Sequence, residues 1–374
     1  MWVDYSRGIA IILVVYRHAF EGLKSTAALA QNGVDVASGY FHLEAANILL
    51  YSFRMPLFFM VSGVFLSSSL AKRGLAALAG SKVRTILYPY FVWGFLQISI
   101  QMLFSGFTNG QKEWSSFLYL FYAPRNVEHF WYLLALFNVT LLYAFAKARL
   151  KWSHPTQLLT GALLFFLSAY ISQHNIELGL LSDVLHYYIF MAIGDAAANF
   201  LRSQKTQQFM ASPRNLLLML LPFAGAQLYF LYSNVQHLAQ APKYLYVEYY
   251  QPHLFLGIAL TGAVFVMMAA SVLNWYQACT WLRLLGQHSL YIYVLHVIVF
   301  AAIRVFLIRV LHVYEVHTLL ACCVAGGVVI PVFIYKLVQH SPLAYLFAWP
   351  EPAQPARTSP VIKSPTPAYE HTTP

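Results

Sequence analysis

The chain has 374 residues, of which 59% are hydrophobic and only 10% are charged, and its formal net charge is +10. Soluble globular domains contain about 25% charged residues, so this composition excludes an ordinary soluble domain and indicates an integral membrane protein. The positive charge does not indicate a nucleic-acid partner, because the lysines and arginines are scattered in short clusters between apolar segments.

The apolar segments, taken in chain order, predict an all-α membrane protein with about ten transmembrane helices. Several of the segments are long enough to cross a hydrocarbon core of about 30 Å. The first lacks the small-residue cleavage site of a secretory signal, so we expect it to remain in the membrane. We expect one polytopic domain over residues 1–345. The predicted spans cover residues 5–24, 45–68, 84–106, 128–147, 157–173, 180–200, 215–233, 252–273, 288–308 and 317–338.

The lysines and arginines of the predicted loops set the orientation of these spans. Eleven lie in the loops on one side and five in the loops on the other. Cytoplasmic loops carry the excess of positive charge, so the first side is predicted to be cytoplasmic, and with ten spans both termini lie there. The first group is Lys72, Arg73, Lys82, Arg84, Lys147, Arg149, Lys151, Arg202, Lys205, Arg214 and Arg283, and the second is Lys24, Lys112, Arg125, Lys243 and Arg309.

The C-terminal segment, residues 346–374, has a different composition. Seven of the 17 prolines lie in the last 25 residues of the chain. Proline fixes φ and removes a backbone donor, so this segment cannot form a regular span, and we predict a disordered, dispensable tail.

The first predicted span contains the stretch RGIAIILVVYRH, which places charged residues inside an apolar helix. Arg7 and His18 are eleven residues apart, or about 1,100° of helical rotation, so their side chains share one face and lie roughly 16 Å apart along the axis. Asp4 falls on the same stripe. Arg17 lies about 80° away from Arg7, and we expect it to snorkel outward beside Glu21, four residues later.

Two interpretations of Arg7 and His18 follow from this spacing. An ionisable group within the membrane is costly and normally faces a polar cavity or a partner, which favours a functional site. Alternatively, Arg7 is a cytoplasmic anchor, and His18 makes a structural hydrogen bond between helices.

Five segments, in order, resemble the acyltransferase-3 family of integral membrane acyltransferases. The stretch from Arg7 to His18 matches the family's arginine–ten residues–histidine motif. The resemblance extends over roughly residues 3–340, is greatest for the bacterial exopolysaccharide and fucose O-acetylase branch, and includes the number of helices. The segments are VDYSRGIAIILVVYRH (3–18), FRMPLFFMVSGVFL (53–66), VRTILYPYFVWG (83–94), EHFWYLLALF (128–137) and LGQHSLYIYVLHVIV (285–299).

The resemblance implies transfer of an acetyl group from acetyl-CoA to a sugar hydroxyl of a surface polysaccharide or its lipid-linked repeat unit, in the bacterial inner membrane. A sugar hydroxyl is a poor nucleophile, and a positioned histidine can accept its proton. His18 is the candidate for this role, although a histidine can also carry the acetyl group itself. Acetyl-CoA would be a substrate. We expect no metal and no permanently bound cofactor, and Cys279, Cys322 and Cys323 lack metal-ligand or disulfide spacing.

The other candidate residues divide between donor and acceptor. Arg7, together with Arg84 and Lys82 at the start of the third predicted span, suits the phosphates of CoA, with Asp4 orienting Arg7. For the acceptor, each candidate has a functional and a structural interpretation. Arg54 binds an acidic sugar or stabilises the oxyanion, or it pairs with Glu44 or a lipid headgroup. Trp131 stacks on a sugar or only packs, and His296 orients the acceptor or makes an interhelical hydrogen bond.

Two positions depart from the family pattern. Arg54 stands where the family often has histidine, and Ser81 replaces the first residue of a basic pair, which leaves Arg84 and, as a substitute, Lys82.

The alternative functions are a transporter or flippase of lipid-linked sugars and a non-enzymatic sensor. A transporter should show internal repeats or helices broken near the membrane midplane, and the sequence has no evident repeat. We also find no Walker loop, nucleophile elbow or zinc-protease motif. An acyltransferase is therefore the function we expect.

Overall fold

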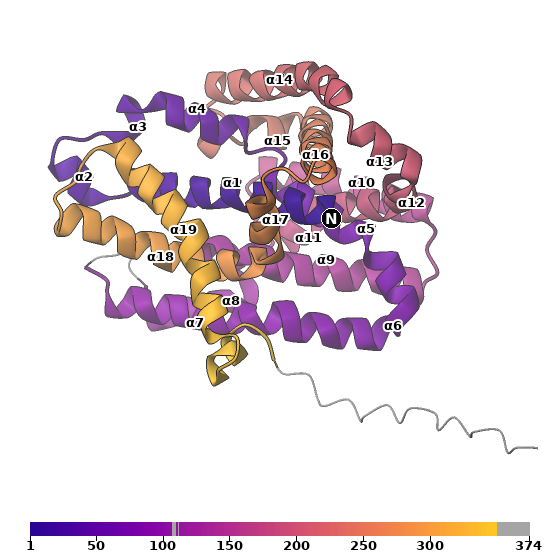
Figure 1. Ribbon diagram of the computed structural model, residues 1–374, viewed down its shortest axis with the longest axis horizontal. Coiled ribbons are helices and arrows are strands. Elements are labelled where there is room, and N and C mark those ends of the chain that lie inside the picture. Colours follow the sequence, from indigo (N-terminus) through magenta and orange to yellow (C-terminus); the bar gives the residue numbers. More distant parts are fainter. Residues whose placement is uncertain (107–109, 111, 350–374) are drawn as a thin grey trace, which may run out of the picture.

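The computed structural model describes residues 1–106, 110 and 112–349, and all regular elements in these residues are helical (Figure 1). The longer helices are α1 Trp2–Lys24, α5 Arg54–Val64, α6 Leu66–Lys82, α7 Tyr88–Leu103, α9 Trp131–Ala148, α10 His154–Gln173, α11 Leu180–Ala196, α14 Pro213–Gln236, α16 Pro252–Trp275, α18 Ser289–Arg309 and α19 Val316–Val338. The shorter α-helices are α2 Ala27–Gln31, α3 Val36–Gly39, α4 Phe41–Leu49, α8 Tyr119–Tyr122, α12 Ala198–Arg202, α13 Gln204–Met210, α15 Tyr246–Tyr250 and α17 Thr280–Gln287. Tighter or wider turns form η1 Val83–Leu87, η2 Trp114–Leu118, η3 Pro124–Phe130, η4 Pro242–Tyr244 and η5 Pro342–Leu346.

The prediction of an all-α, multi-pass membrane protein is confirmed. Among the described residues, eight helical stretches are long and apolar enough to cross a membrane. A helix also forms in each of the other two predicted spans, but these fall outside that group. The helix α1 has charged residues along its length, and α11 is only 17 residues long.

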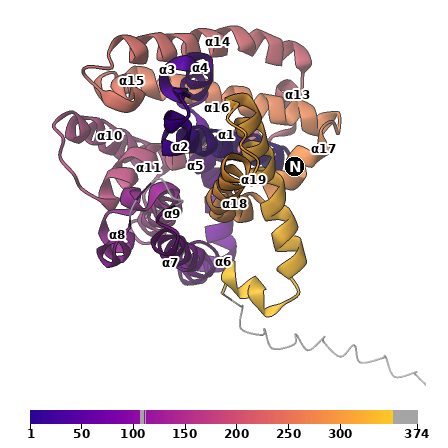
Figure 2. The ribbon, with the colours of Figure 1, turned by 90° about the vertical axis from the view of Figure 1, so that its left-hand side faces the viewer.

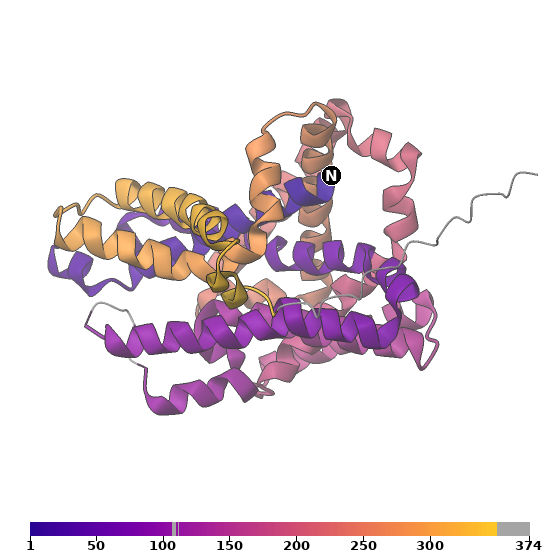
Figure 3. The ribbon, with the colours of Figure 1, turned by 60° about the horizontal axis from the view of Figure 1, so that its bottom comes forward.

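The region from Phe41 to Leu103 differs from the predicted pattern of one span, a loop and another span. The second predicted span is broken, because α4 ends at Leu49 and α5 begins at Arg54. The predicted loop 69–83 is instead mostly helical: α6 is kinked at Gly74, with φ 74° and ψ 167°, and its second part continues through η1 into α7 (Figure 3). The segment is rich in alanine, leucine and lysine, which form helices readily even where the sequence is too polar for a span. The π-helical turn η1 precedes Pro89, which cannot donate a backbone hydrogen bond to the preceding turn.

The helix that carries the predicted motif, α1, lies at the centre of the molecule. It packs against α5, α16, α17, α18 and α19 (Figures 1 and 2). Its contact with α17 depends on two glycines: a Cβ on Gly8 would lie 2.0 Å from the carbonyl oxygen of Leu282, and one on Gly286 would lie 1.7 Å from that of Asp4. Any larger residue would push the helices apart, so these glycines fix the N-terminal half of α1 against α17.

The chain remains packed as far as Trp349. The ring of Phe347 lies 5.2 Å from that of Trp93, the ring of Trp349 lies 5.3 Å from that of Tyr88, and the Trp349 amide donates to the Arg84 carbonyl at 3.3 Å. The predicted tail began at residue 346, and its residues 350–374 lie outside the described part of the chain.

Candidate active site

The C-terminal half of α1 places His18 in a cluster of three histidines that come from three separate elements. His129 lies in η3, just before α9, and His296 lies on α18. The ring centroid of His18 is 5.7 Å from that of His129 and 5.3 Å from that of His296, and the latter two are 4.8 Å apart. His129 and His296 are buried, so the cluster lies in the protein interior.

The hydrogen bonds of His296 determine which of its ring nitrogens carries a proton. Its Nδ1 lies 2.7 Å from the carbonyl oxygen of Tyr293 and 3.1 Å from that of Ile292, and a carbonyl oxygen can only accept. Nδ1 is therefore the donor, and Nε2 of the neutral ring keeps its lone pair. Within the described residues, Nε2 of His296 and both ring nitrogens of His129 are buried without a hydrogen-bond partner. Buried polar atoms are normally paired, so the cluster has unused hydrogen-bonding capacity beside His18.

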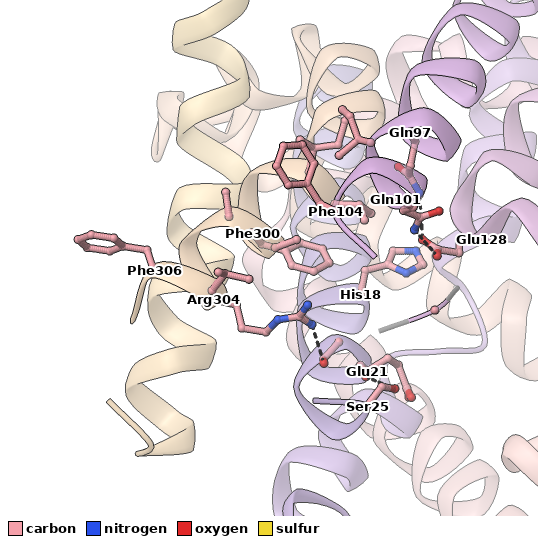
Figure 4. A pocket seen from close by; sticks show the side chains of 18 of the residues that line it. His18, Glu21, Ser25, Gln97, Gln101, Phe104, Glu128, Phe300, Arg304 and Phe306 are labelled. Carbon is pink, nitrogen blue, oxygen red and sulfur yellow. Dashed lines mark hydrogen bonds between the residues drawn. The ribbon is translucent and has the colours of Figure 1, made fainter. Parts of the chain in front are cut away.

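A cavity of about 760 Å³ opens beside His18 (Figure 4). We call it the large cavity. It is bounded by the C-terminal halves of α1, α7 and α18 and by η3, and most of its wall is apolar. Its volume is within the range of about 300–1,000 Å³ that is typical of small-molecule sites. Besides His18, its polar lining consists of Glu21, Ser25, Gln97, Gln101, Glu128 and Arg304.

Glu128 has an unusual backbone conformation at the wall of the large cavity. Its φ of 58° and ψ of −123° correspond to the first central position of a type II′ turn, which glycine normally occupies. A side chain at such a position costs about 1–3 kcal/mol in backbone strain. The carboxylate accepts hydrogen bonds from Gln97 at 3.0 Å and from Gln101 at 2.8 Å, one on each oxygen. These two glutamines are one turn apart on α7, so they present their amides on the same face.

His18 also lines a second cavity of about 80 Å³, which we call the small cavity. The charges of its lining differ from those of the large cavity. Three arginines from three elements line it: Arg17 on α1, Arg54 at the start of α5 and Arg125 in η3. Glu248 is the acidic residue of its lining. A space of this size is below the usual range for sugar-sized or larger ligands and suits a group of a few atoms.

Arg54 lies at the break between α4 and α5 and satisfies the backbone there. It is 2% exposed, and its Nε donates to the Leu50 carbonyl, while Nη2 donates to both oxygens of Asn47. Its Nη1 is buried and has no partner within the described residues. Glu44, one of its expected partners, instead accepts from Lys24 at 2.9 Å. The guanidinium group therefore keeps one donor nitrogen available at the small cavity.

The expected outward position of Arg17 beside Glu21 is wrong. The guanidinium carbon of Arg17 lies 4.8 Å from the centre of the Tyr51 ring, and the side chain lines the small cavity. Glu21 accepts from Asn47 at 3.2 Å and lies 3.5 Å from Lys24. The reason is tertiary, because Tyr51, in the turn after α4, packs against Arg17 and lines the small cavity with it.

The residues predicted to bind the donor lie near the other end of α1. Lys82 interacts electrostatically with Arg7, so the structure brings these two cations together from α1 and α6. Arg84 is two residues further along, in η1. Asp4 lies 3.2 Å from the N-terminal amine and, among the described residues, forms its ion pair there rather than with Arg7, which differs from the predicted orienting role.

Trp131 lines the small cavity, where its ring is already in contact with other side chains. It stacks on Tyr187 with ring centroids 5.5 Å apart, and the guanidinium carbon of Arg125 lies 4.5 Å from its centre. Arg125 in turn forms an ion pair of 2.6 Å with the buried Asp183. These contacts agree with the packing interpretation of Trp131.

Several polar residues near His18 were not predicted from the sequence. His129 and Glu128 lie within the quoted segment EHFWYLLALF, but no role was assigned to them. A usable signal for Gln97 and Gln101 is their spacing of four residues in an apolar span, which puts two amides on one helical face. Arg304 and Glu248 come from distant segments and have no comparable signal.

Comparison with known proteins establishes the family of the chain. A family model described as an acyltransferase domain matches residues 1–336, so the chain belongs to this family, as its motifs predicted. The protein is therefore a multi-pass membrane acyltransferase.

Among curated proteins, the chain is similar to nodulation protein NolL of Sinorhizobium fredii. The two are 26% identical over 321 residues, which cover 79% of this chain and 77% of the relative. No solved structure matches.

Proposed function

We propose that this acyltransferase moves an acetyl group from acetyl-CoA to a sugar hydroxyl of a surface polysaccharide or its lipid-linked repeat unit, in the bacterial inner membrane. The observation that carries this proposal is the position of His18. His18 lies on α1 at the junction of the large cavity and the small, arginine-lined cavity. Arg7 lies near the other end of the same helix.

In this reaction His18 accepts the proton of the sugar hydroxyl while the hydroxyl oxygen attacks the carbonyl carbon of the thioester. The new C–O bond forms, the C–S bond breaks, and the proton passes to the sulfur of the departing CoA. If His18 carries the acetyl group itself, its ring nitrogen attacks first and the sugar oxygen attacks second. Rapid quenching with labelled donor and no acceptor distinguishes the routes, because only the second leaves label on the protein.

Arg54 is suited to stabilise the negative charge that develops on the thioester oxygen. Its unpartnered Nη1 and its position beside His18 at the small cavity support this role. Donors that are fixed in place before the reaction stabilise an oxyanion without reorganisation. We therefore assign the small cavity to the acetyl group and the large cavity to the acceptor, with His296 positioning the acceptor or the ring of His18. Trp131 is assigned to the wall of the small cavity.

The cations near the N-terminus of α1 are suited to the phosphates of CoA. Arg7 and Lys82 carry like charges and are near enough to repel each other electrostatically, and a phosphate between them would offset that repulsion. Arg84 is assigned to the same site and Asp4 to its edge.

We also propose ten spans with both termini in the cytoplasm, in which α1 and α11 add to the eight long apolar stretches. The large cavity then lies in the outer half of the membrane and the cationic cluster at the inner boundary. Reporter fusions after Pro374 and within the 107–126 loop should give opposite locations. The same location for both would overturn this topology.

One observation supports the transporter alternative: the second predicted span is broken between Leu49 and Arg54. The family match to acyltransferases decides against it as the main activity. In the direct test, radiolabelled acetyl-CoA is added to membranes from cells that have this gene and from cells that lack it. Label in the polysaccharide or glycolipid fraction only when the gene is present supports the proposal, and equal label in both overturns it.

A further inference from the structure

We propose that Glu128 is the acceptor-binding carboxylate of the large cavity and that it selects a neutral sugar with two neighbouring hydroxyl groups. This inference rests on the proposed function and names the class of its acceptor. It begins from the local geometry of Glu128, Gln97 and Gln101, a cluster to which no role was assigned from the sequence.

The backbone of Glu128 indicates that its side chain has a use at this position. The residue occupies a conformation that glycine adopts without strain, at φ 58° and ψ −123°. Strained positions of this kind cluster at ligand-binding and active sites. The next residue is His129, whose ring contacts both His18 and His296, so the turn connects the carboxylate to the histidine cluster.

The hydrogen bonds of Glu128 leave a defined capacity for a ligand. An ionised carboxylate has about four acceptor positions, two on each oxygen. Gln97 and Gln101 use one on each oxygen, so each oxygen keeps one for a hydroxyl donor. Two parallel acceptors of this kind match two neighbouring hydroxyls of a sugar ring. Gln97 is 2% exposed, and its side-chain carbonyl has no partner within the described residues, which adds a further unused acceptor.

The charges around the large cavity favour a neutral ligand. Glu21 and Glu128 contribute two negative charges, and Arg304 contributes one positive charge. Arg304 already donates to the Gly22 carbonyl at 2.8 Å and is oriented by it (Figure 4). A carboxylate or phosphate on the sugar would meet a net negative lining, whereas hydroxyl groups find acceptors. The arginines that would attract an acidic sugar line the small cavity instead.

In the resulting arrangement Glu128 accepts hydrogen bonds from two neighbouring hydroxyls of the sugar, and the hydroxyl that reacts lies next to this pair with its single proton directed at His18. His18 takes that proton, the hydroxyl oxygen attacks the thioester carbon, and the proton leaves with the sulfur of CoA. Glu128 is thus a residue that contacts the substrate and determines which hydroxyl faces His18.

The test uses membrane vesicles containing the full chain, acetyl-CoA, and octyl glycosides of fucose, galactose and glucose. Each glycoside is paired with a deoxy analogue that lacks one hydroxyl of a neighbouring pair. The wild type should use the intact sugars and reject the deoxy analogues. In Glu128→Gln, which loses the charge and half of the acceptors, the KM for the intact acceptor should rise about 10- to 100-fold, as expected for a hydrogen bond to a charged group. Its discrimination against the deoxy analogue should disappear, while its KM for acetyl-CoA stays unchanged.

Two further variants separate binding from folding. Glu128→Gly removes the backbone strain, which offsets the hydrogen bonds lost by Gln97 and Gln101, so this variant should resist heating about as well as the wild type and still fail to discriminate between the acceptors. A purely structural Glu128 predicts the reverse, with lower thermal stability and preserved discrimination. Glu177→Gln, in an exposed loop, is the matched control and should behave as the wild type.

The outcomes distinguish the two proposals. If the wild type acetylates the probes but Glu128→Gln keeps the same acceptor KM and discrimination, the role of Glu128 is overturned and the proposed function stands. If the wild type transfers acetyl groups to no sugar, in probes or in native polysaccharide, the proposed function is overturned and this inference falls with it.

Discussion

The two cavities that meet at His18 differ in size and in charge. The large cavity, about 760 Å³, has two glutamates and one arginine in its lining, whereas the small cavity, about 80 Å³, has three arginines and one glutamate. A carboxylate favours the positive charge that a histidine gains when it accepts a proton, and a guanidinium group favours an oxygen that gains negative charge. In the proposed mechanism, His18 therefore serves both halves of the acyl transfer because it lies where the two environments meet.

The variant His18→Ala removes the group common to both cavities, so we expect the largest effect. Loss of a general base lowers the rate by typically 10²–10⁴-fold, which should abolish detectable acetylation. A structural histidine would instead cost about 0.6–2 kcal/mol in folding. Acetyl groups on the purified polysaccharide are measured together with the amount of protein in the membrane. His174→Ala, at an exposed position, is the control. Near-normal acetylation by His18→Ala at normal abundance would rule out this mechanism.

The variant Arg54→Gln tests the small cavity alone. Removal of an oxyanion donor typically lowers kcat by about 10²–10³-fold, with little change in the KM of either substrate. Arg54→Lys keeps the charge at the break before α5 and should recover part of the activity. A loss that only follows the amount of folded protein would instead assign Arg54 to the support of the helix break.

The variant Arg84→Ala tests a site remote from both cavities and should affect the donor alone. A charge-assisted contact with phosphate contributes about 1.5–3 kcal/mol, so donor affinity should fall by roughly one to two decades. Activity should return when acetyl-CoA is raised, and Arg7→Ala should behave in the same way. The exposed Arg149, changed to alanine, is the control for lost positive charge. An unchanged dependence on acetyl-CoA would remove Arg84 from the donor site.

The smallest effect is expected from deletion of the chain after Trp349. The deleted residues are rich in proline and contain no candidate site residue, whereas Phe347 and Trp349 pack against α7 and are retained. Polysaccharide acetylation should stay near the wild-type value. Complete loss at normal membrane abundance would give the tail a function, and loss of abundance after removal of Phe347 as well would mark the end of the folded domain.

Residue type and order in the sequence were enough to determine the fold class, the family and the shared face of Arg7 and His18. Apolar segments of sufficient length have to form helices in a membrane, because every backbone group must be paired within the segment. The helical period then decides which residues share a face, so the position of His18 on the same stripe as Arg7 follows from eleven residues of spacing.

Only the tertiary structure decided what surrounds His18. His129 and Glu128 reach it from η3, Arg54 reaches it from the start of α5, and no local period relates these segments to α1, because they are far apart in the sequence. The same holds for Arg17, which helical geometry placed correctly on a different face from Arg7, while its contact with Tyr51, in the turn after α4, depends on packing. Spacing within one helix is set by the backbone, but the environment of a side chain is set by whichever helices pack against it.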